Sequence, residues 1–423
     1  MRELLRCLPG AGIAPTILTQ RGNQRKWEGA ANELSLVPRN RPARLLWERT
    51  RLLTSVHNAS RRTGDPLPLV LHSPHYTMPG LLNGSPKRAG WQPAHVVTVH
   101  DLTFFTRPTD HSRDKRLLFQ AAIKRAANQA DAIVAVSQAT ADLLESLIKP
   151  SVPVRVIEHG VDHQRFRPAA DPAEEAADDA LVQSLGVRGP FILHLGTIEP
   201  RKNVDLLLRA YQKLCEQMKE PPALVLAGTS WPGEWAKLTE LAKAITTEYP
   251  KAQILRTGGV PDEAVAPLYR SALMVVYPSK EEGFGLPFLE ALACGAPTIT
   301  TTGSVMASIA QGATITVDPT DPNALANELL VAILATGANV ATAEAGATEA
   351  NAATAATPAT PATPATAATA ATAATAATAA TAATAATAAP AANPHRESGL
   401  RIAAKYRWEH SAAAHADLYR FLQ

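Results

Sequence analysis

Short apolar runs alternate with longer amphipathic segments along most of this chain. The runs have the length and β-branched composition of buried strands, and the segments repeat apolar residues at helical spacing. This alternation predicts parallel sheets with helices on both faces. The runs fall into two sets, so we predict an α/β protein of two doubly wound (Rossmann-like) parallel-sheet domains facing a cleft. The predicted strands are AHVVTVHDL, DAIVAVS, VPVRVIEHGVD, PFILHLG, ALVLAGTS, AQILRTGGV and LMVVYPS.

Changes in composition divide the chain further. The segment GVDHQRFRPAADPAEEAADDA separates the two sets of strands, which predicts an N-terminal domain at 1–165 and a C-terminal domain at 166–340. Ala, Thr and Pro then dominate, with Thr at every third position from Thr354 to Thr387. That period fits neither an amphipathic helix nor a strand, so we predict a disordered insertion at 341–394.

The helical pattern resumes after this tract, and we predict C-terminal helices over 395–423. Their candidate core contacts are Trp408, Ala412, Leu418 and Phe421.

Charge and cysteine content narrow the function classes. The 41 basic and 38 acidic residues give a net charge of +3, too mild for a nucleic-acid partner but compatible with weak attraction to an anionic membrane. Cys7, Cys215 and Cys294 are widely spaced, which favours reduced thiols in a cytoplasmic protein. No apolar run is long enough to span a bilayer. Any membrane contact is therefore expected to be peripheral, at the inner face.

The stretch EEGFGLPFLEALACGAP carries the strongest chemical pattern. It follows a predicted strand, and Pro287 suits the first turn of a helix. Gly283 and Gly285 supply a tight turn, and the helix N-terminus attracts an anion such as a phosphate. Glu282 and Glu290 flank this point, and carboxylates accept hydrogen bonds from hydroxyl groups. Hydroxyls beside phosphates indicate a sugar nucleotide.

With these motifs in order, the chain resembles retaining glycosyltransferases of the GT-B fold, family 4. The resemblance covers about residues 68 to 335 and the final helices. It implies transfer of a sugar from a nucleotide donor in the interdomain cleft, with retention of anomeric configuration. The motifs are HSPHYTMP, VVTVHDLTFF, DAIVAVSQAT, HGVDHQRFRP, LGTIEPRKN, YRSALMVVYPSKEEGFGLPFLEALACGAPTIT and TVDPTDP.

The resemblance implies roles on the phosphate side of the donor. Lys202 and Arg201 are expected to bind the phosphates and stabilise charge on the leaving diphosphate; a solvated pair capping a turn is the alternative. Many family members carry Arg where this chain has Thr197, so Arg201 is expected to supply the second cation. Backbone amides are expected to approach the donor at Gly283, Phe284 and Gly285.

Further roles follow from the same resemblance. Glu282 is expected to bind donor-sugar hydroxyls, Glu290 the ribose hydroxyls, and Val260 to pack on the nucleobase. His100 matches a histidine that contacts the donor near the reaction centre, so His100, Lys202 and Glu282 are the catalytic candidates. Because Glu282 lies in a loop, Glu282→Ala is expected to abolish turnover with limited loss of folding.

Other motif residues receive weaker assignments. His72 and His75 either take part in the site or close a loop. Ser137, and Gly160 with Asp162, are expected at the cleft and hinge.

No cofactor is expected, because no Asp-x-Asp or similar metal cluster is evident and the cations take that role. The expected partners are a nucleotide-sugar donor, with GDP-mannose favoured over UDP- or ADP-glucose, and a saccharide or lipid-linked acceptor. A catalytically silent subunit that binds a nucleotide sugar or a partner enzyme is the alternative.

The start of the chain departs from the family pattern. MRELLRCLPGAG resembles the first helix, and the strand and Gly-rich loop that normally precede it are missing. Loss of a central strand leaves its two neighbours without ladder partners. We expect the true start to lie upstream, with a degenerate gene copy as the alternative.

Overall fold

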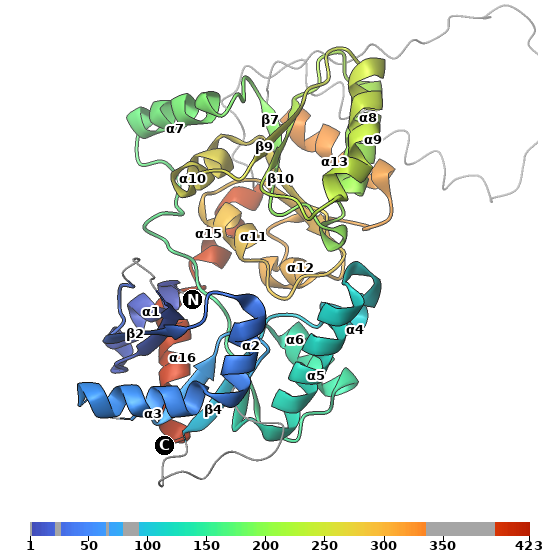
Figure 1. Cartoon of the computed structure of the whole chain (residues 1–423). Coiled ribbons are helices and arrows are strands. Elements are labelled where there is room, and N and C mark those ends of the chain that lie inside the picture. Colours follow the sequence, from blue (N-terminus) through green and yellow to red (C-terminus); the bar gives the residue numbers. More distant parts are fainter. Residues whose placement is uncertain (1, 22–26, 65–66, 79–92, 336–393) are drawn as a thin grey trace, which may run out of the picture.

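The computed structural model describes residues 2–21, 27–64, 67–78, 93–335 and 394–423. The predicted insertion therefore falls, up to residue 393, outside the described residues. The described chain forms two lobes, each built on parallel β-structure (Figure 1). This confirms the predicted α/β class with two parallel-sheet domains.

The C-terminal lobe is organised around a six-stranded parallel sheet with strand order β12-β11-β10-β7-β8-β9. Its central strands β7, β8 and β10 are almost wholly buried and mostly apolar, as expected when helices cover both faces. Ile192 packs into one buried cluster and its neighbour Leu193 into the other. The strands are β7 (Phe191–Leu195), β8 (Ala223–Ala227), β9 (Ile254–Gly258), β10 (Met274–Tyr277), β11 (Thr298–Thr301) and β12 (Ile315–Val317).

Helices cover both faces of this sheet (Figure 1). α8 (Val204–Gln217) and α13 (Pro322–Ala335) pack together in the cluster that contains Ile192. The other helices of this lobe are α7 (Pro172–Ser184), α9 (Glu234–Glu248), α10 (Asp262–Ser271), α11 (Leu286–Ala293), α12 (Val305–Ala310) and the 3-10 turn η3 (Pro200–Lys202).

The N-terminal lobe contains two separate sheets. One pairs β1 (Thr16–Gln20) with β2 (Asn32–Val37); the other has the order β3-β4-β5-β6. Every pairing in both is parallel. The separation of β1 from β3 agrees with the expectation that two strands of this lobe lack a partner strand between them. The second sheet comprises β3 (Val70–Ser73), β4 (Ala94–Val99), β5 (Ala132–Ala135) and β6 (Val154–Val156).

The helices of the N-terminal lobe lie on both sides of these sheets. They are α1 (Arg2–Cys7), α2 (Arg41–Thr50), α3 (Leu52–Thr63), α4 (Thr103–Thr106), α5 (Arg113–Gln129) and α6 (Gln138–Leu147), with 3-10 turns η1 (Pro9–Ala11) and η2 (Pro108–Asp110).

The two final helices serve different lobes. α15 (Pro394–Ala403) packs on α11, whereas α16 (Trp408–Phe421) packs on α1 in the N-terminal lobe (Figure 1). Three predicted core contacts of α16 are buried: Trp408, Ala412 and Leu418. The prediction for Phe421 is wrong, since this residue is 72% exposed. It is the last residue of the helix, and its ring faces the guanidinium of Arg155 instead of the core.

Candidate functional site

The Gly-Phe-Gly turn lies between β10 and α11 and needs glycine at both ends. Gly285 has a φ of +92°, and a Cβ there would lie 2.5 Å from Met306 Cγ. A side chain at position 283 is excluded for a different reason, because its Cβ would lie 1.7 Å from the carbonyl oxygen of His100. A side chain at Gly283 would therefore push the lobes apart.

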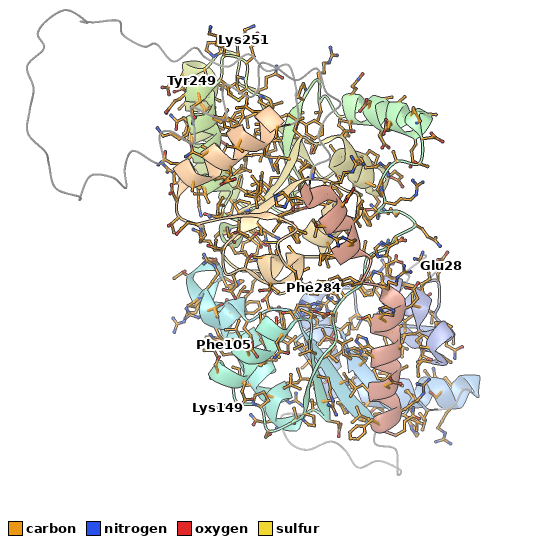
Figure 2. The ribbon with its side chains drawn as sticks, turned by 180° about the vertical axis from the view of Figure 1, so that it is seen from behind. Glu28, Phe105, Lys149, Tyr249, Lys251 and Phe284 are labelled. Carbon is orange, nitrogen blue, oxygen red and sulfur yellow. The ribbon has the colours of Figure 1, made fainter. Side chains whose placement is uncertain are left out.

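Polar contacts join the lobes at the same loop. The Ser137 hydroxyl, at the carboxyl end of β5, donates to the Gly283 carbonyl at 2.7 Å. The Thr106 hydroxyl donates to a Glu281 carboxylate oxygen at 2.7 Å. Between these contacts, the buried ring of Phe284 lies 5.2 Å from that of His159, and Figure 2 shows Phe284 at the junction of the two lobes. The loop is thus held from both sides.

A compact ion cluster lies at the carboxyl end of β7 and β10. The Glu282 carboxylate binds two cations, Arg201 Nη1 and Lys202 Nζ, each at 2.5 Å. The Ser279 hydroxyl donates to the same carboxylate at 2.9 Å. Arg201 Nε also contacts Glu199 at 2.8 Å. η3 positions both cations on consecutive residues, immediately before α8.

The charges in this cluster depend on one another. Burial alone would raise the pKa of Glu282, but Lys202 and Arg201 lower it below its ordinary value. Burial dominates at Glu199 and raises its pKa, even though Arg201 opposes the shift. His194 lies beneath the site, and burial lowers its pKa to about 4, so it is neutral. Glu282 is therefore the firmly ionised carboxylate of the cluster.

One edge of this cluster borders a large cavity. A space of about 1260 Å³ extends through the N-terminal lobe and reaches Glu199, Arg201 and Trp231 of the C-terminal lobe. Lys202 and Glu282 are not among the lining residues; their side chains are 11% and 7% exposed and lie behind Arg201. Arg201 thus presents the cluster to the cavity.

The second predicted carboxylate, Glu290, occupies a different environment. It lies within α11, and its carboxylate accepts a 3.4 Å hydrogen bond from the Tyr269 hydroxyl. Burial raises its pKa to about 7, although the charge of Arg165 partly offsets the shift. Val260 is partly buried against the same apolar cluster that includes α11. Glu290 therefore titrates near neutrality, unlike Glu282.

The remaining predicted residues are not drawn into the ion cluster by any contact in the described structure. His100 Nε2 lies 2.9 Å from the Pro74 carbonyl oxygen, and its backbone meets Gly283. The Thr197 hydroxyl is 3.5 Å from that of Thr229, so it contacts a neighbouring loop and not the cations. The fold thus brings together Arg201, Lys202 and Glu282 directly, with His100 approaching through the glycine.

The structure also shows the contacts of the residues with weaker assignments. His72 is half-buried, with ring nitrogens 2.5 Å from the Tyr419 hydroxyl and 2.7 Å from Thr98 Oγ1. His75 is exposed and lines the cavity. Gly160 lies at the crossing between lobes, where a Cβ would be 2.1 Å from the backbone nitrogen of Trp408. Arg6 Nη2 lies 3.6 Å from the carboxylate of Asp162.

Sequence reasoning missed several members of the site. Glu199 directly precedes the Pro-Arg-Lys turn, and a carboxylate next to two cations was a readable signal. Ser279 was less accessible, because only the loop geometry turns its hydroxyl toward Glu282. The pair of Thr106 and Glu281 joins residues 175 positions apart, which no local pattern reveals.

Within the described ranges, no cluster of three or more His, Cys, Asp or Glu side chains suits a metal ion. Over the same residues, no helix combines the length and apolar content needed to cross a bilayer.

Both lobes match known protein-family models. Residues 1–165 match the model of Glycosyltransferase Family 4, and residues 181–347 match that of Glycosyl transferases group 1. O-antigen chain mannosyltransferase B of Escherichia coli is 31% identical over 62% of this chain and 64% of that protein. A GDP-mannose-dependent alpha-(1-6)-phosphatidylinositol monomannoside mannosyltransferase of Mycolicibacterium smegmatis is 28% identical over 48% of this chain and 53% of its own length. The chain therefore spans less than two thirds of these relatives.

Solved structures agree on the fold. Sucrose-phosphate synthase from Thermosynechococcus elongatus aligns with a TM-score of 0.63 at 19% identity, covering 100% of this chain and 92% of that one. A glycosyltransferase from Rickettsia africae aligns with a TM-score of 0.62 at 15% identity, covering 99% and 93%. With both family models matched in order and the two-lobed fold shared, the chain belongs to the group 1/family 4 glycosyltransferases of the GT-B fold.

Proposed function

We propose that this chain is a retaining hexosyltransferase that moves mannose from GDP-mannose to a saccharide or lipid-linked acceptor. The observation that carries the proposal is the convergence of Arg201 and Lys202 on one point, each 2.5 Å from the Glu282 carboxylate. Two fixed cations beside a helix N-terminus suit a diphosphate leaving group. Family membership supports the reaction class, and the mannosyltransferases among the relatives support the sugar.

Donor binding on this proposal exchanges one anion for another. Arg201 and Lys202 bind Glu282, so a diphosphate approaching from the cavity meets Arg201 first and competes with the carboxylate for its N–H donors. A Glu282 oxygen released in this way becomes an acceptor for sugar hydroxyls. As the bond to the sugar breaks, charge builds on the diphosphate and the cations stabilise it.

The other end of the donor is assigned to Glu290. The ribose hydroxyls would donate to its carboxylate, and the nucleobase would pack near Val260. His100, at the end of β4, would approach the sugar from the N-terminal lobe. Backbone amides of the turn between β10 and α11 complete the donor site on this proposal, at Gly283, Phe284 and Gly285. Thr197 borders the site without supplying a charge.

On the acceptor side, we assign the N-terminal lobe and a cytoplasmic location with peripheral contact at the membrane's inner face. The supporting observation is on α2 and α3, where Leu46 is 64% exposed and Arg61 and Arg62 are exposed. Exposed basic and apolar side chains on the same pair of helices favour an anionic lipid surface.

A panel of GDP-mannose, UDP-glucose and ADP-glucose tests the proposal, with release of nucleoside diphosphate as the readout. We expect GDP-mannose to be turned over fastest and Lys202→Ala to slow turnover by about 100-fold or more. Lys280→Ala is the control, because Lys280 is an exposed lysine of the neighbouring loop between β10 and α11. Turnover unaffected by Lys202→Ala would refute the site.

The divided sheet of the N-terminal lobe favours a second candidate, a catalytically silent subunit that binds a nucleotide sugar. Calorimetric binding of GDP-mannose without turnover of any donor would support this candidate. Binding together with turnover would exclude it.

A further inference from the structure

The end of the large cavity that reaches the C-terminal lobe carries a tryptophan. Trp231 lies in the loop after β8, is partly buried and lines the cavity together with Arg201. Two backbone hydrogen bonds tie its loop to the loop after β7: Trp231 N donates to the Ile198 carbonyl at 3.0 Å, and Ile198 N donates to the Thr229 carbonyl at 2.8 Å. Trp231 is therefore fixed beside the loop that leads to the two cations.

The N-terminal lobe meets Trp231 with further aromatic rings. The centroid of the His111 ring lies 5.9 Å from that of Trp231, and Lys115 Nζ lies 6.0 Å from the centroid of the same indole. His111 packs on Phe104 with a centroid distance of 4.2 Å, and Phe104 stacks on Phe119 at 4.7 Å. All five side chains line the cavity. Both lobes thus contribute to one aromatic wall.

A fixed carboxylate lines the same end of the cavity. Asp101 lies two residues after β4, and its Oδ1 accepts hydrogen bonds from Thr103 N at 3.2 Å and Thr103 Oγ1 at 2.9 Å. His111 Nε2 lies 3.1 Å from the same hydroxyl oxygen. Burial lowers the pKa of His111, and the charges of Asp101 and Arg201 act on that pKa in opposite directions. The aromatic wall therefore lies within electrostatic reach of both a carboxylate and a phosphate-binding candidate.

These features suit the two kinds of surface that a pyranose ring presents. A sugar ring carries C–H groups on its faces, and they pack well on the electron-rich face of an aromatic side chain. The hydroxyls at the rim of the ring donate to carboxylates in charge-assisted hydrogen bonds. An acyl chain would use the aromatic wall, but it would cover Asp101 without offering a hydrogen bond, which is unfavourable.

We propose that this end of the cavity is the acceptor subsite and binds a pyranose, with Trp231 as the stacking platform and Asp101 as the hydroxyl acceptor. The proposal rests on the hexosyltransferase function proposed above and specifies its acceptor: the reactive end is a sugar ring, whether or not a lipid carries it. Arg201 lines the same cavity, so a bound ring lies next to the position assigned to the diphosphate. Because Trp231 and Asp101 belong to different lobes, the subsite is complete only when the lobes are in contact.

The test measures transfer from GDP-mannose to methyl pyranosides of mannose, glucose, galactose and N-acetylglucosamine. Mannitol is the control ligand, because it carries similar hydroxyls without a ring. Trp231→Leu keeps apolar bulk but removes the flat face, so it should raise the KM for the best pyranoside at least about tenfold. The Kd for GDP, measured by calorimetry, should stay within about twofold, because GDP is assigned to the other side of Arg201.

Trp235→Leu is the matched control for this variant. Trp235 lies on α9, packs against the buried cluster of α8, and has the guanidinium of Arg256 5.2 Å from its ring centroid. It is not among the described residues that line the cavity. The KM for the pyranoside should therefore be unchanged in Trp235→Leu. An unchanged KM in Trp231→Leu, an equal rise of KM and of the Kd for GDP, or binding of mannitol as tight as that of the pyranoside would each overturn the proposal.

A second variant covers the case in which Trp231→Leu does not fold. Asp101→Asn keeps an amide oxygen for the hydrogen bonds from Thr103 and removes the charge that strengthens a bond from a sugar hydroxyl. The KM for the pyranoside should rise at least about fivefold, again with little change in the Kd for GDP. An unchanged KM in this variant would refute the role of Asp101 and, with it, the subsite.

Tryptophan fluorescence separates this proposal from the enzyme proposal, because it needs no turnover. With GDP bound, the best pyranoside should change the emission of the wild type and of Trp235→Leu, but not that of Trp231→Leu. This pattern without turnover of any donor supports the subsite while the transferase proposal fails. Turnover of GDP-mannose with transfer to a polyprenyl phosphate, and with no binding of any pyranoside, overturns the subsite and leaves the transferase proposal standing.

Discussion

The α-carbon of Gly283 lies against the carbonyl oxygen of His100, so close that a Cβ would stand 1.7 Å from that oxygen. Gly283 belongs to the C-terminal lobe and His100 to the N-terminal lobe. The absence of a side chain at Gly283 therefore allows the loop before α11 to contact the carboxyl end of β4. Glu282 directly precedes Gly283, so this contact also fixes the position of the ion cluster around Glu282.

We predict that Gly283→Ala opens the junction between the lobes. The added methyl group cannot fit, and each lobe keeps its own core, so Tm should fall by only a few degrees while donor turnover falls at least about tenfold. Activity assays with small-angle scattering test this, and the radius of gyration should rise. Gly10→Ala is the control, because nothing lies within 4 Å of a Cβ there. Normal turnover in Gly283→Ala would contradict the prediction.

Ser137→Ala should weaken the same junction by removing a hydrogen bond. The Ser137 hydroxyl caps α6 and also donates to the Gly283 carbonyl at 2.7 Å. Ser304→Ala is a matched control, because Ser304 caps α12 but bonds only within its own lobe. Both variants should lose about 1–2 kcal/mol of unfolding free energy. Only Ser137→Ala should change the KM for the donor, and equal kinetics in both variants would count against the interlobe role.

Glu282→Ala should destabilise the protein as well as inactivate it, which revises the expectation drawn from its loop position. Its removal leaves Lys202, whose side chain is 11% exposed, without its carboxylate, a change worth about 3–5 kcal/mol for a buried pair. Urea unfolding measures this. The double variant with Lys202→Met should recover part of the loss, because it removes the unpaired charge.

The control for Glu282→Ala is Glu281→Ala. Glu281 accepts hydrogen bonds from the neutral hydroxyl of Thr106, so its loss leaves no charge unpaired. We expect this variant to stay within about 1 kcal/mol of the wild type. If Glu282→Ala unfolded at the wild-type urea concentration, the ion cluster would have no structural role.

The pH dependence of stability should report Glu290. Burial raises its folded-state pKa to about 7, above the ordinary 4.5 of the unfolded chain. The folded state therefore binds the proton more tightly between these values, and this contribution to stability is present at low pH and is lost as pH rises toward 7.

A neutral side chain at position 290 removes the loss of stability that ionisation of Glu290 causes. Glu290→Gln should be more stable than the wild type at pH 8 by roughly 1–3 kcal/mol, since each pKa unit is worth about 1.4 kcal/mol. The advantage should shrink steadily on lowering the pH from 7 to 5. Urea unfolding at several pH values measures it, with Glu263→Gln, an exposed carboxylate of α10, as control. A constant difference at all pH values would show that Glu290 does not titrate near neutrality.

The sequence determined the class of fold and singled out the candidate residues of the site. Apolar runs such as those of β7, β8 and β10 are buried on both faces, so each is readable without its neighbours. The turn between β10 and α11 was also readable, because glycine and proline report backbone requirements directly. Arg201 and Lys202 were assigned through the family resemblance of LGTIEPRKN, whereas Glu282 also follows a predicted strand, where ligands of doubly wound sheets bind.

Only the tertiary structure decided which side chains meet. The pairing of Glu282 with both cations, the contact of Gly283 with His100, and the bond from Thr106 to Glu281 join residues far apart in sequence. Phe421 has the helical spacing of a core residue but is exposed, because at the last residue of α16 its ring lies against Arg155. The chain's own pattern specifies the period and polarity of each element, whereas contacts between elements depend on how separate segments dock.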